Sequence, residues 1–162
     1  MTNKNKRSIT LEGVHVENMQ NDLSISIENV QKIVQTVIVF AGEFCDEVGI
    51  HFVDIHKIGE LHAEYFNDPS PTDCISFPLH HASDEVDDYR ILGDVFICPK
   101  AAIDYAAAHR GDAYREMTLY VVHGLLHLMG YDDIEDIDRA VMRAAEKRHM
   151  QYLEQQDLLP HG

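Results

Sequence analysis

The chain has 162 residues, of which 45% are hydrophobic and 25% charged. These proportions are those of a globular protein with its own core, and they exclude an intrinsically disordered chain. Acidic residues outnumber basic ones by 28 to 13, and the net charge of −15 disfavours non-specific coating of nucleic acid without excluding a local basic groove. No apolar run reaches the roughly 18 residues of a membrane span, and no apolar stretch follows the basic N-terminus, so neither a membrane anchor nor a signal peptide is expected.

The length fits one domain, which we expect to cover residues 1–162, with residues 1–8 as a disordered tail. The three cysteines, Cys45, Cys74 and Cys98, are far apart and form no C-x-x-C pair. A disulfide scaffold or a cysteine zinc site is therefore not expected, and the three side chains are predicted to be small core residues. The predicted compartment is the reducing cytoplasm.

The first half of the chain alternates between strand and helix patterns. The first strand is expected at Leu23–Ile27, where apolar residues alternate with serine. Helical spacing with a wide apolar face follows over Asn29–Cys45. A second strand is expected at Val48–Val53 and a short amphipathic helix at His56–Tyr65. The two prolines of Asn67–Pro71 predict a loop.

Two further strands are expected at Cys74–Leu79 and Ile91–Cys98. The polar, acidic stretch His80–Asp88 between them predicts an exposed loop. Because these two strands are consecutive, they can pair directly, whereas the other strands need crossover connections.

Three helices are expected in the last third of the chain. The first covers Lys100–His109, with Gly111 as its stop. The second, Tyr114–Met129, is apolar on nearly all sides and is therefore expected in the middle of the domain. A final amphipathic helix of about 20 residues follows. The order β-α-β-α-β-β-α-α-α predicts an α+β domain of four strands and five helices.

Two histidines lie within the apolar helix. His123 and His127 are four residues apart and share one face, a spacing at which two imidazoles can reach one metal ion. Both imidazoles need a partner when buried, and a shared cation would supply it. Gly130 can reverse the chain after the helix, which allows Asp133 to fold back as a third ligand.

Two simpler interpretations stay open. His123 and His127 could be neutral, hydrogen-bonded core residues, because H-x-x-x-H pairs arise by chance in a chain with 11 histidines. Asp133, or its neighbour Asp132, could instead cap the last helix.

Three protein ligands with one open position are typical of a catalytic rather than a structural zinc. Such an ion lowers the pKa of a bound water toward about 7 and polarises a carbonyl or phosphoryl oxygen. Gly124 stands where the peptidase motif H-E-x-x-H has its glutamate, so the helical general base of that class is missing. The sequence therefore disfavours a peptidase of that class.

Three motifs resemble those of one family. The run His123-Gly-Leu-Leu-His-Leu-Met-Gly-Tyr-Asp-Asp133 resembles the signature H-G-x-L-H-L-x-G-Y-D-H of the YbeY family, the bacterial endoribonucleases of ribosomal RNA maturation. Pro71-Thr-Asp-Cys-Ile-Ser-Phe-Pro78 is similar to the family's P-T-D-V-L-S-F-P strand, and Leu92-Gly-Asp-Val-Phe-Ile-Cys98 to its L-G-D-I-x-I-C strand. The motifs follow the family's order and cover most of residues 61–138.

The resemblance implies an α+β fold with a small mixed four-stranded sheet, about five helices and a zincin-like core. It implies one zinc ion held by three histidines, of which His123 and His127 match the first two. The third position is Asp133 here, whose negative charge is expected to make a bound water less acidic. It also implies a cytoplasmic, single-strand-specific endoribonuclease of 16S rRNA 3′-end maturation and ribosome quality control, with ribosomal RNA, the 30S subunit and ribosomal proteins as partners.

Two further positions bear on the implied site. Phe66 stands where the family has an arginine, which would stabilise charge on a transferring phosphoryl group. Ser76 is either a phosphate contact in the cleft or a strand residue with a local hydrogen bond. Four basic residues are candidates to replace the arginine, although a surface position is the expectation for each: Lys57, Lys100, Arg110 and Arg115.

Two other functions compete with the endoribonuclease. The first is a ribosome-assembly binding factor with a structural metal, because an acidic protein binds basic proteins more readily than bare RNA. The second is a metal-dependent hydrolase of another substrate class, such as peptides, which Gly124 disfavours. The sequence carries no signal for a general base or an oligomeric state.

Overall fold

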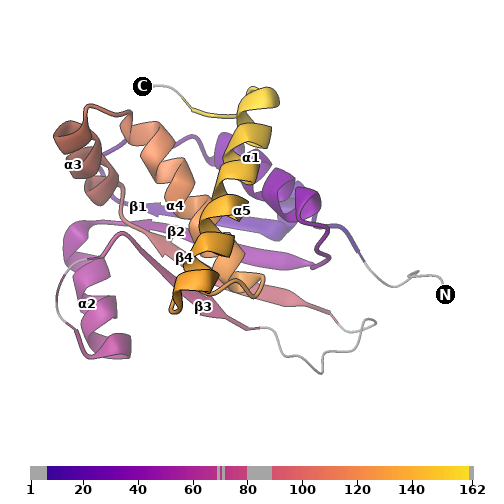
Figure 1. Cartoon of the computed structure of the whole chain (residues 1–162), viewed down its shortest axis with the longest axis horizontal. Helices are drawn as coiled ribbons and strands as arrows, with labels where there is room; N and C mark the ends of the chain where they lie inside the picture. Colours follow the sequence, from indigo (N-terminus) through magenta and orange to yellow (C-terminus); the bar gives the residue numbers. More distant parts are fainter. Residues whose placement is uncertain (1–6, 69, 71, 80–88, 161–162) are drawn as a thin grey trace.

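The computed structural model describes residues 7–68, 70, 72–79 and 89–160. Its strands form one mixed sheet in the order β1-β2-β4-β3 (Figure 1). Their bounds are Val14–Met19 (β1), Glu47–Val53 (β2), Cys74–Pro78 (β3) and Ile91–Ile97 (β4). The pairs β1–β2 and β2–β4 are parallel, whereas β3 runs antiparallel to β4 and forms an edge of the sheet.

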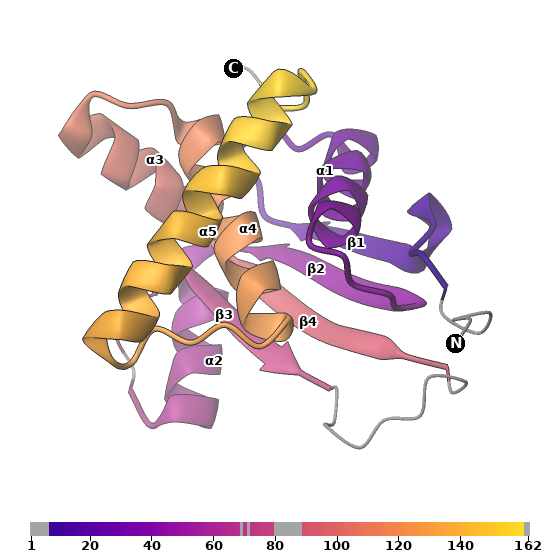
Figure 2. The ribbon, with the colours of Figure 1, turned by 45° about the vertical axis from the view of Figure 1, so that its right-hand side comes forward.

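Helices cover both faces of this sheet. The two helices α1 and α4 pack on one face, and α5 crosses α4 on its outer side (Figure 2). The helix α2 lies against β3, and α3 packs beside α4. Their bounds are Ile27–Phe40 (α1), Ile55–Phe66 (α2), Pro99–His109 (α3), Ala113–Leu128 (α4) and Asp136–Gln155 (α5). The predicted α+β class with four strands and five helices is confirmed.

Alternate residues of the strands face two separate apolar clusters. Ile50 and Phe52 of β2 are buried in the main core with α1 and α4. Val53, the next residue of β2, belongs to a smaller cluster with Ile58 of α2. Side chains of a strand alternate between its faces, so one strand serves both clusters. Within the described residues, no helix is long and apolar enough to cross a bilayer.

The expected strand at Leu23–Ile27 is wrong, and the first strand is β1. Ser26 caps α1, and its hydroxyl accepts a hydrogen bond from the N–H of Asn29 at 3.2 Å. This cap starts a helix at Ile27, so a short alternating pattern was overridden by the N-cap chemistry of serine.

Two helix ends also differ from expectation. The first helix ends at Phe40 rather than Cys45, and Gly42 follows with a φ of 77°. After α3, the left-handed residue is Arg110 and not Gly111. The expected loop at 80–88 and residues 1–6 of the expected tail lie outside the described residues, while Arg7 pairs with Asp46.

Gly124 allows α4 to lie close against the sheet. A Cβ atom at this position would lie 2.4 Å from Cγ1 of Val95 on β4 and 3.0 Å from Sγ of Cys74 on β3. The helix therefore meets the sheet at a point where there is no room for a side chain. This contact also explains why the glutamate of H-E-x-x-H is missing, since that side chain would point into the sheet.

We expect Gly124→Ala to lower the free energy of unfolding by about 1–3 kcal/mol, because the added methyl overpacks the interface with the sheet. In an unhindered helix interior the same change raises stability by up to about 1 kcal/mol. Gly111→Ala, in the loop between α3 and α4, is the control for an added methyl at an open site, because its Cβ would meet only Cα of Ala106, at 3.9 Å. Urea denaturation measures both variants, and unchanged or higher stability of Gly124→Ala would contradict the close packing.

Candidate metal centre

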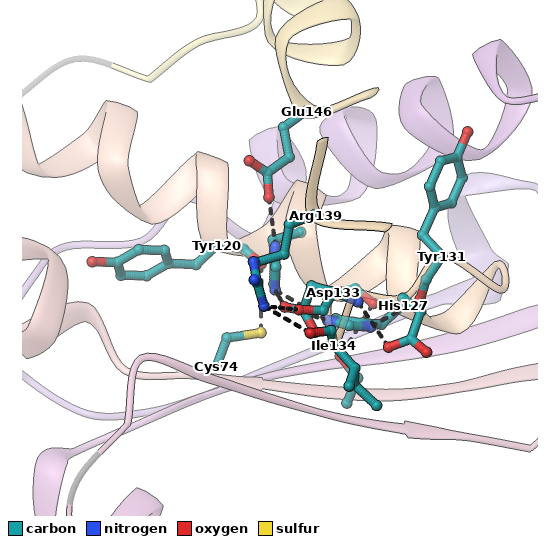
Figure 3. Close-up of polar contacts among 12 residues, drawn as sticks. Cys74, Tyr120, His127, Tyr131, Asp133, Ile134, Arg139 and Glu146 are labelled. Carbon is teal, nitrogen blue, oxygen red and sulfur yellow. Dashed lines mark hydrogen bonds and ion pairs between the residues drawn. The ribbon is translucent and has the colours of Figure 1, made fainter. Parts of the chain in front are cut away.

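The C-terminal half of α4 and the loop after it bring three ligand atoms together (Figure 3). His123 and His127 lie one turn apart on α4. Gly130 reverses the chain with a φ of 101°, and the N–H of Tyr131 donates to the carbonyl of Leu126 at 3.0 Å. This reversal returns Asp133 to the two imidazoles, as the sequence predicts.

The three ligand atoms are mutually close. The Nε2 atoms of His123 and His127 are 3.1 Å apart. Oδ2 of Asp133 lies 3.5 Å from Nε2 of His123 and 3.4 Å from Nε2 of His127. One metal ion can therefore contact all three atoms.

The outer nitrogens of both rings are already hydrogen-bonded. Nδ1–H of His123 donates to Oε2 of Glu146 on α5 at 2.5 Å, and Nδ1–H of His127 donates to the carbonyl of Tyr131 at 3.0 Å. Since a carboxylate and a carbonyl only accept hydrogen bonds, each neutral ring keeps its lone pair on Nε2. Two lone pairs and a carboxylate thus face one another, and this donor set fits a metal ion.

The electrostatics of the centre favour positive charge. Burial disfavours the imidazolium form of His123, but the hydrogen bond to Glu146 and the negative charges of Glu146 and Asp133 outweigh burial and raise the pKa of His123. The same arrangement of negative groups would stabilise a bound cation. Without an ion, a proton on Nε2 of His123 would satisfy the same three acceptors, so the metal content of the protein decides between a bound cation and a hydrogen-bonded pair of histidines.

The loop that carries Asp133 is fixed by its own contacts. Nη1 of Arg139 donates to the carbonyl of Ile134 at 2.7 Å and to that of Asp133 at 3.4 Å. Oδ1 of Asp132 accepts from the N–H of Asp133 at 2.7 Å. The proposed capping role of Asp132 or Asp133 is wrong, because the N-cap of α5 is Glu135.

The ligands open onto a cavity of about 620 Å³. Its walls are the end of α4, the loop after α4, the edge strand β3 and the end of α2. Phe66 lines the cavity at its rim and is 53% exposed. No described lining residue is a lysine or arginine, so none of the four candidate cations lines it: Lys57, Lys100, Arg110 and Arg115.

Ser76 of β3 also lines this cavity. Its hydroxyl donates to the carbonyl of Gly124 at 3.1 Å, which ties the edge strand to α4 beside the ligands. Burial raises the pKa of the neighbouring Cys74 thiol, which donates to the carbonyl of Tyr120 at 3.6 Å. Cys74 lies outside the group formed by His123, His127 and Asp133.

Sequence reasoning missed Glu146, although it holds the first ligand. Glu146 lies 23 residues beyond His123 on another helix, and it is only 7% exposed. The signal in the sequence is an acidic residue on the same face of α5 as the apolar residues Met142, Met150 and Leu153.

Three ligands at the edge of an open cavity are the features of a catalytic rather than a structural metal centre. The α+β fold with this centre on its central helix therefore defines a candidate metal-dependent hydrolase. Comparison with known proteins specifies the family.

The family model described as "Endoribonuclease YbeY" matches residues 15–154, and the chain belongs to this family. It is 52% identical over 145 residues to the endoribonuclease YbeY of Protochlamydia amoebophila, covering 90% of this chain and 95% of the relative. It is 34% identical over 147 residues to that of Chlamydia trachomatis serovar D, covering 90% and 91%. The solution structure of TM1509 from Thermotoga maritima is similar, with a TM-score of 0.61, 25% identity and coverage of 85% and 87%.

We expect Glu146→Gln to weaken binding of a divalent ion by about 10- to 100-fold, because the amide keeps the shape but loses the charge that supports His123. Glu154→Gln is the control on the same helix, since Glu154 is exposed and pairs only weakly with Arg115, at 3.7 Å. Competition with a chelating dye measures the affinity of both variants. Equal affinity of Glu146→Gln and the parent protein would show that the contact does not support the ligand.

Proposed function

We propose that this protein is a metal-dependent, single-strand-specific endoribonuclease that acts in 16S rRNA 3′-end maturation and ribosome quality control. The observation that carries the proposal is the convergence of His123, His127 and Asp133 on one point of an open cavity. Membership of the YbeY family supports RNA as the substrate. The 30S subunit, ribosomal proteins and a cytoplasmic location belong to the same proposal.

Zinc is the ion that we propose for this centre. Four-coordinate zinc has bonds of about 2.0–2.1 Å to nitrogen and about 2.0–2.2 Å to oxygen, which places tetrahedral ligand atoms about 3.3–3.5 Å apart. The distances of 3.1, 3.4 and 3.5 Å among the three ligand atoms are close to this value. Two imidazoles and a carboxylate are also a common zinc donor set.

The residues of the chain have separate roles in this mechanism. His123, His127 and Asp133 would hold the ion, which supplies Lewis acidity that polarises a phosphoryl oxygen and activates water. Glu146 keeps the lone pair of His123 directed at the site, and the carbonyl of Tyr131 does the same for His127. The rings therefore need no reorientation when the ion binds.

Ser76 is proposed as a substrate contact at the cavity wall. Its hydroxyl proton is engaged with Gly124, so the oxygen keeps lone pairs that can accept a hydrogen bond from RNA. Contact with a phosphate would require the hydroxyl to turn away from Gly124.

A ribosome-assembly binding factor is the second candidate function. The absence of lysine and arginine from the described cavity lining favours it, because RNA backbones are usually held by such side chains. Its net charge of −15 also suits basic protein partners.

Elemental analysis tests the metal centre first. We expect about one zinc per chain in the purified protein and a loss of most of it in Asp133→Asn, which removes the charge facing both imidazoles. Asp132→Asn is the control, because asparagine keeps the oxygen that accepts from the N–H of residue 133 while removing the same charge. Full zinc content in Asp133→Asn would remove Asp133 from the ligand set.

Cleavage of single-stranded RNA tests the activity. We expect His127→Ala to abolish cleavage that the parent protein and His109→Ala both perform, because His109 stacks on Tyr105 of α3 and does not line the cavity. If the zinc-loaded parent protein leaves RNA intact but co-sediments with 30S subunits, and His127→Ala does so too, the binding factor replaces the nuclease.

A further inference from the structure

Two aromatic rings from α2 form a shelf at the rim of the metal cavity. The shelf consists of His62 and Phe66, which are four residues apart on one face of the helix. Their ring centroids are 5.5 Å apart and their planes are inclined by 48°, so a flat base can stack on only one of the two rings. Phe66 is the last residue of α2, so the shelf lies where the helix reaches the edge strand β3.

Hydrogen bonds and a neighbouring ring hold the shelf in place. Nδ1–H of His62 donates to the carbonyl of Ser70 at 2.8 Å. Ser70 is in turn fixed by Asp68, which accepts from its N–H at 3.0 Å and from its hydroxyl at 2.6 Å. The ring of Phe66 also lies 6.4 Å from that of Phe77. A fixed ring loses little conformational freedom when it binds a ligand.

The charge of the cavity limits what the shelf can bind. All described lining residues come from 62–78 and 123–133, and the sequence has no lysine or arginine from 58 to 89 or from 116 to 138. The lining does include Asp73, Asp132 and Asp133. Among the described lining residues the cavity thus offers phosphates no lysine or arginine, so a bound metal ion would be the main attraction for a phosphate there.

The nearby Arg139 does not change this balance. Its guanidinium donates to the carbonyls of Asp133 and Ile134 and pairs with Asp136. These contacts hold the metal-binding loop, and contact with RNA would require breaking them.

We infer that the Phe66 ring of the shelf, with His62 beside it, stacks on an unpaired nucleobase of RNA, next to the phosphate at the metal centre. A nucleobase has an uncharged π-face, which an acidic cavity does not repel, and aromatic rings are the usual platform for such a face. The shelf thus gives the selectivity for single strands, because the faces of bases in a duplex are covered by their neighbours. This inference rests on the proposed function, with RNA as the substrate.

Fluorescence provides the direct test, because the chain contains no tryptophan. Phe66→Trp places a single indole on the shelf. Rapid mixing of the zinc-loaded variant with oligo(A) should quench its fluorescence before cleavage begins, whereas an abasic oligonucleotide with the same phosphates should not. Tyr105→Trp is the matched control, because Tyr105 is 47% exposed, stacks on a histidine four residues away and lies outside the cavity.

Affinity and salt dependence provide the second test. Phe66→Ala and Phe66→Leu should each weaken oligo(A) binding by roughly 5- to 150-fold, the effect of losing one base-stacking contact. The leucine variant keeps an apolar contact with Phe77, so a loss common to both reports the ring rather than the packing. The slope of log affinity against log salt should be no steeper than about −1 for the parent protein, and Phe66→Arg should steepen it by about 0.7.

The outcomes separate the shelf from the proposed function. Zinc-dependent RNA cleavage combined with equal quenching by abasic and adenine probes, or with unchanged affinity of Phe66→Leu, would overturn the shelf and leave the nuclease intact. Quenching by oligo(A) alone, without any cleavage, would support the shelf and overturn the nuclease. Absence of both binding and cleavage would overturn both.

Discussion

The candidate metal centre depends on one physical constraint: three hydrogen-bond acceptors are forced to face one another. Nε2 of His123, Nε2 of His127 and a carboxylate oxygen of Asp133 lie within 3.5 Å of each other, and both outer ring nitrogens are committed elsewhere. Without a cation or a proton between them these atoms repel. Hydrogen bonds to Glu146 and to the carbonyl of Tyr131 hold the two histidine rings in this orientation. The folded chain therefore maintains a site that favours positive charge.

The centre is inseparable from the core. The helix that carries both histidines is also the most buried helix, and Gly124 between them lets it touch the sheet without a side chain. The glutamate that contacts His123 comes from α5, which crosses α4 on its outer side (Figure 2). Changes in the packing of either helix therefore move the ligands. The hydrogen bond from Ser76 to the carbonyl of Gly124 also connects the edge strand β3 to α4.

The protein has a net charge of −15, and its proposed substrate, RNA, is also negatively charged. The described lining of the cavity contains no lysine or arginine, so an acidic chain would have to bind a polyanion there without such side chains. The ion would then supply most of the local positive charge, and the aromatic shelf would supply contacts that phosphate repulsion does not oppose. In this arrangement Phe66 would contribute to substrate binding by stacking, at a position where the similar family motif has an arginine.

The sequence alone determined the α+β class, nearly all of the elements and the three metal-ligand candidates. Helical periodicity, the spacing of His123 and His127 and the reversing glycine are local properties, and each requires only a few neighbouring residues. The prediction of a strand at Leu23–Ile27 was wrong because the N-cap of Ser26 outweighed a short alternation of apolar and polar residues. Only the tertiary structure decided that Glu146 supports the first ligand and that Phe66 reaches the rim of the metal cavity. These contacts join segments that lie far apart in the chain, and no local pattern encodes a distance between separate elements.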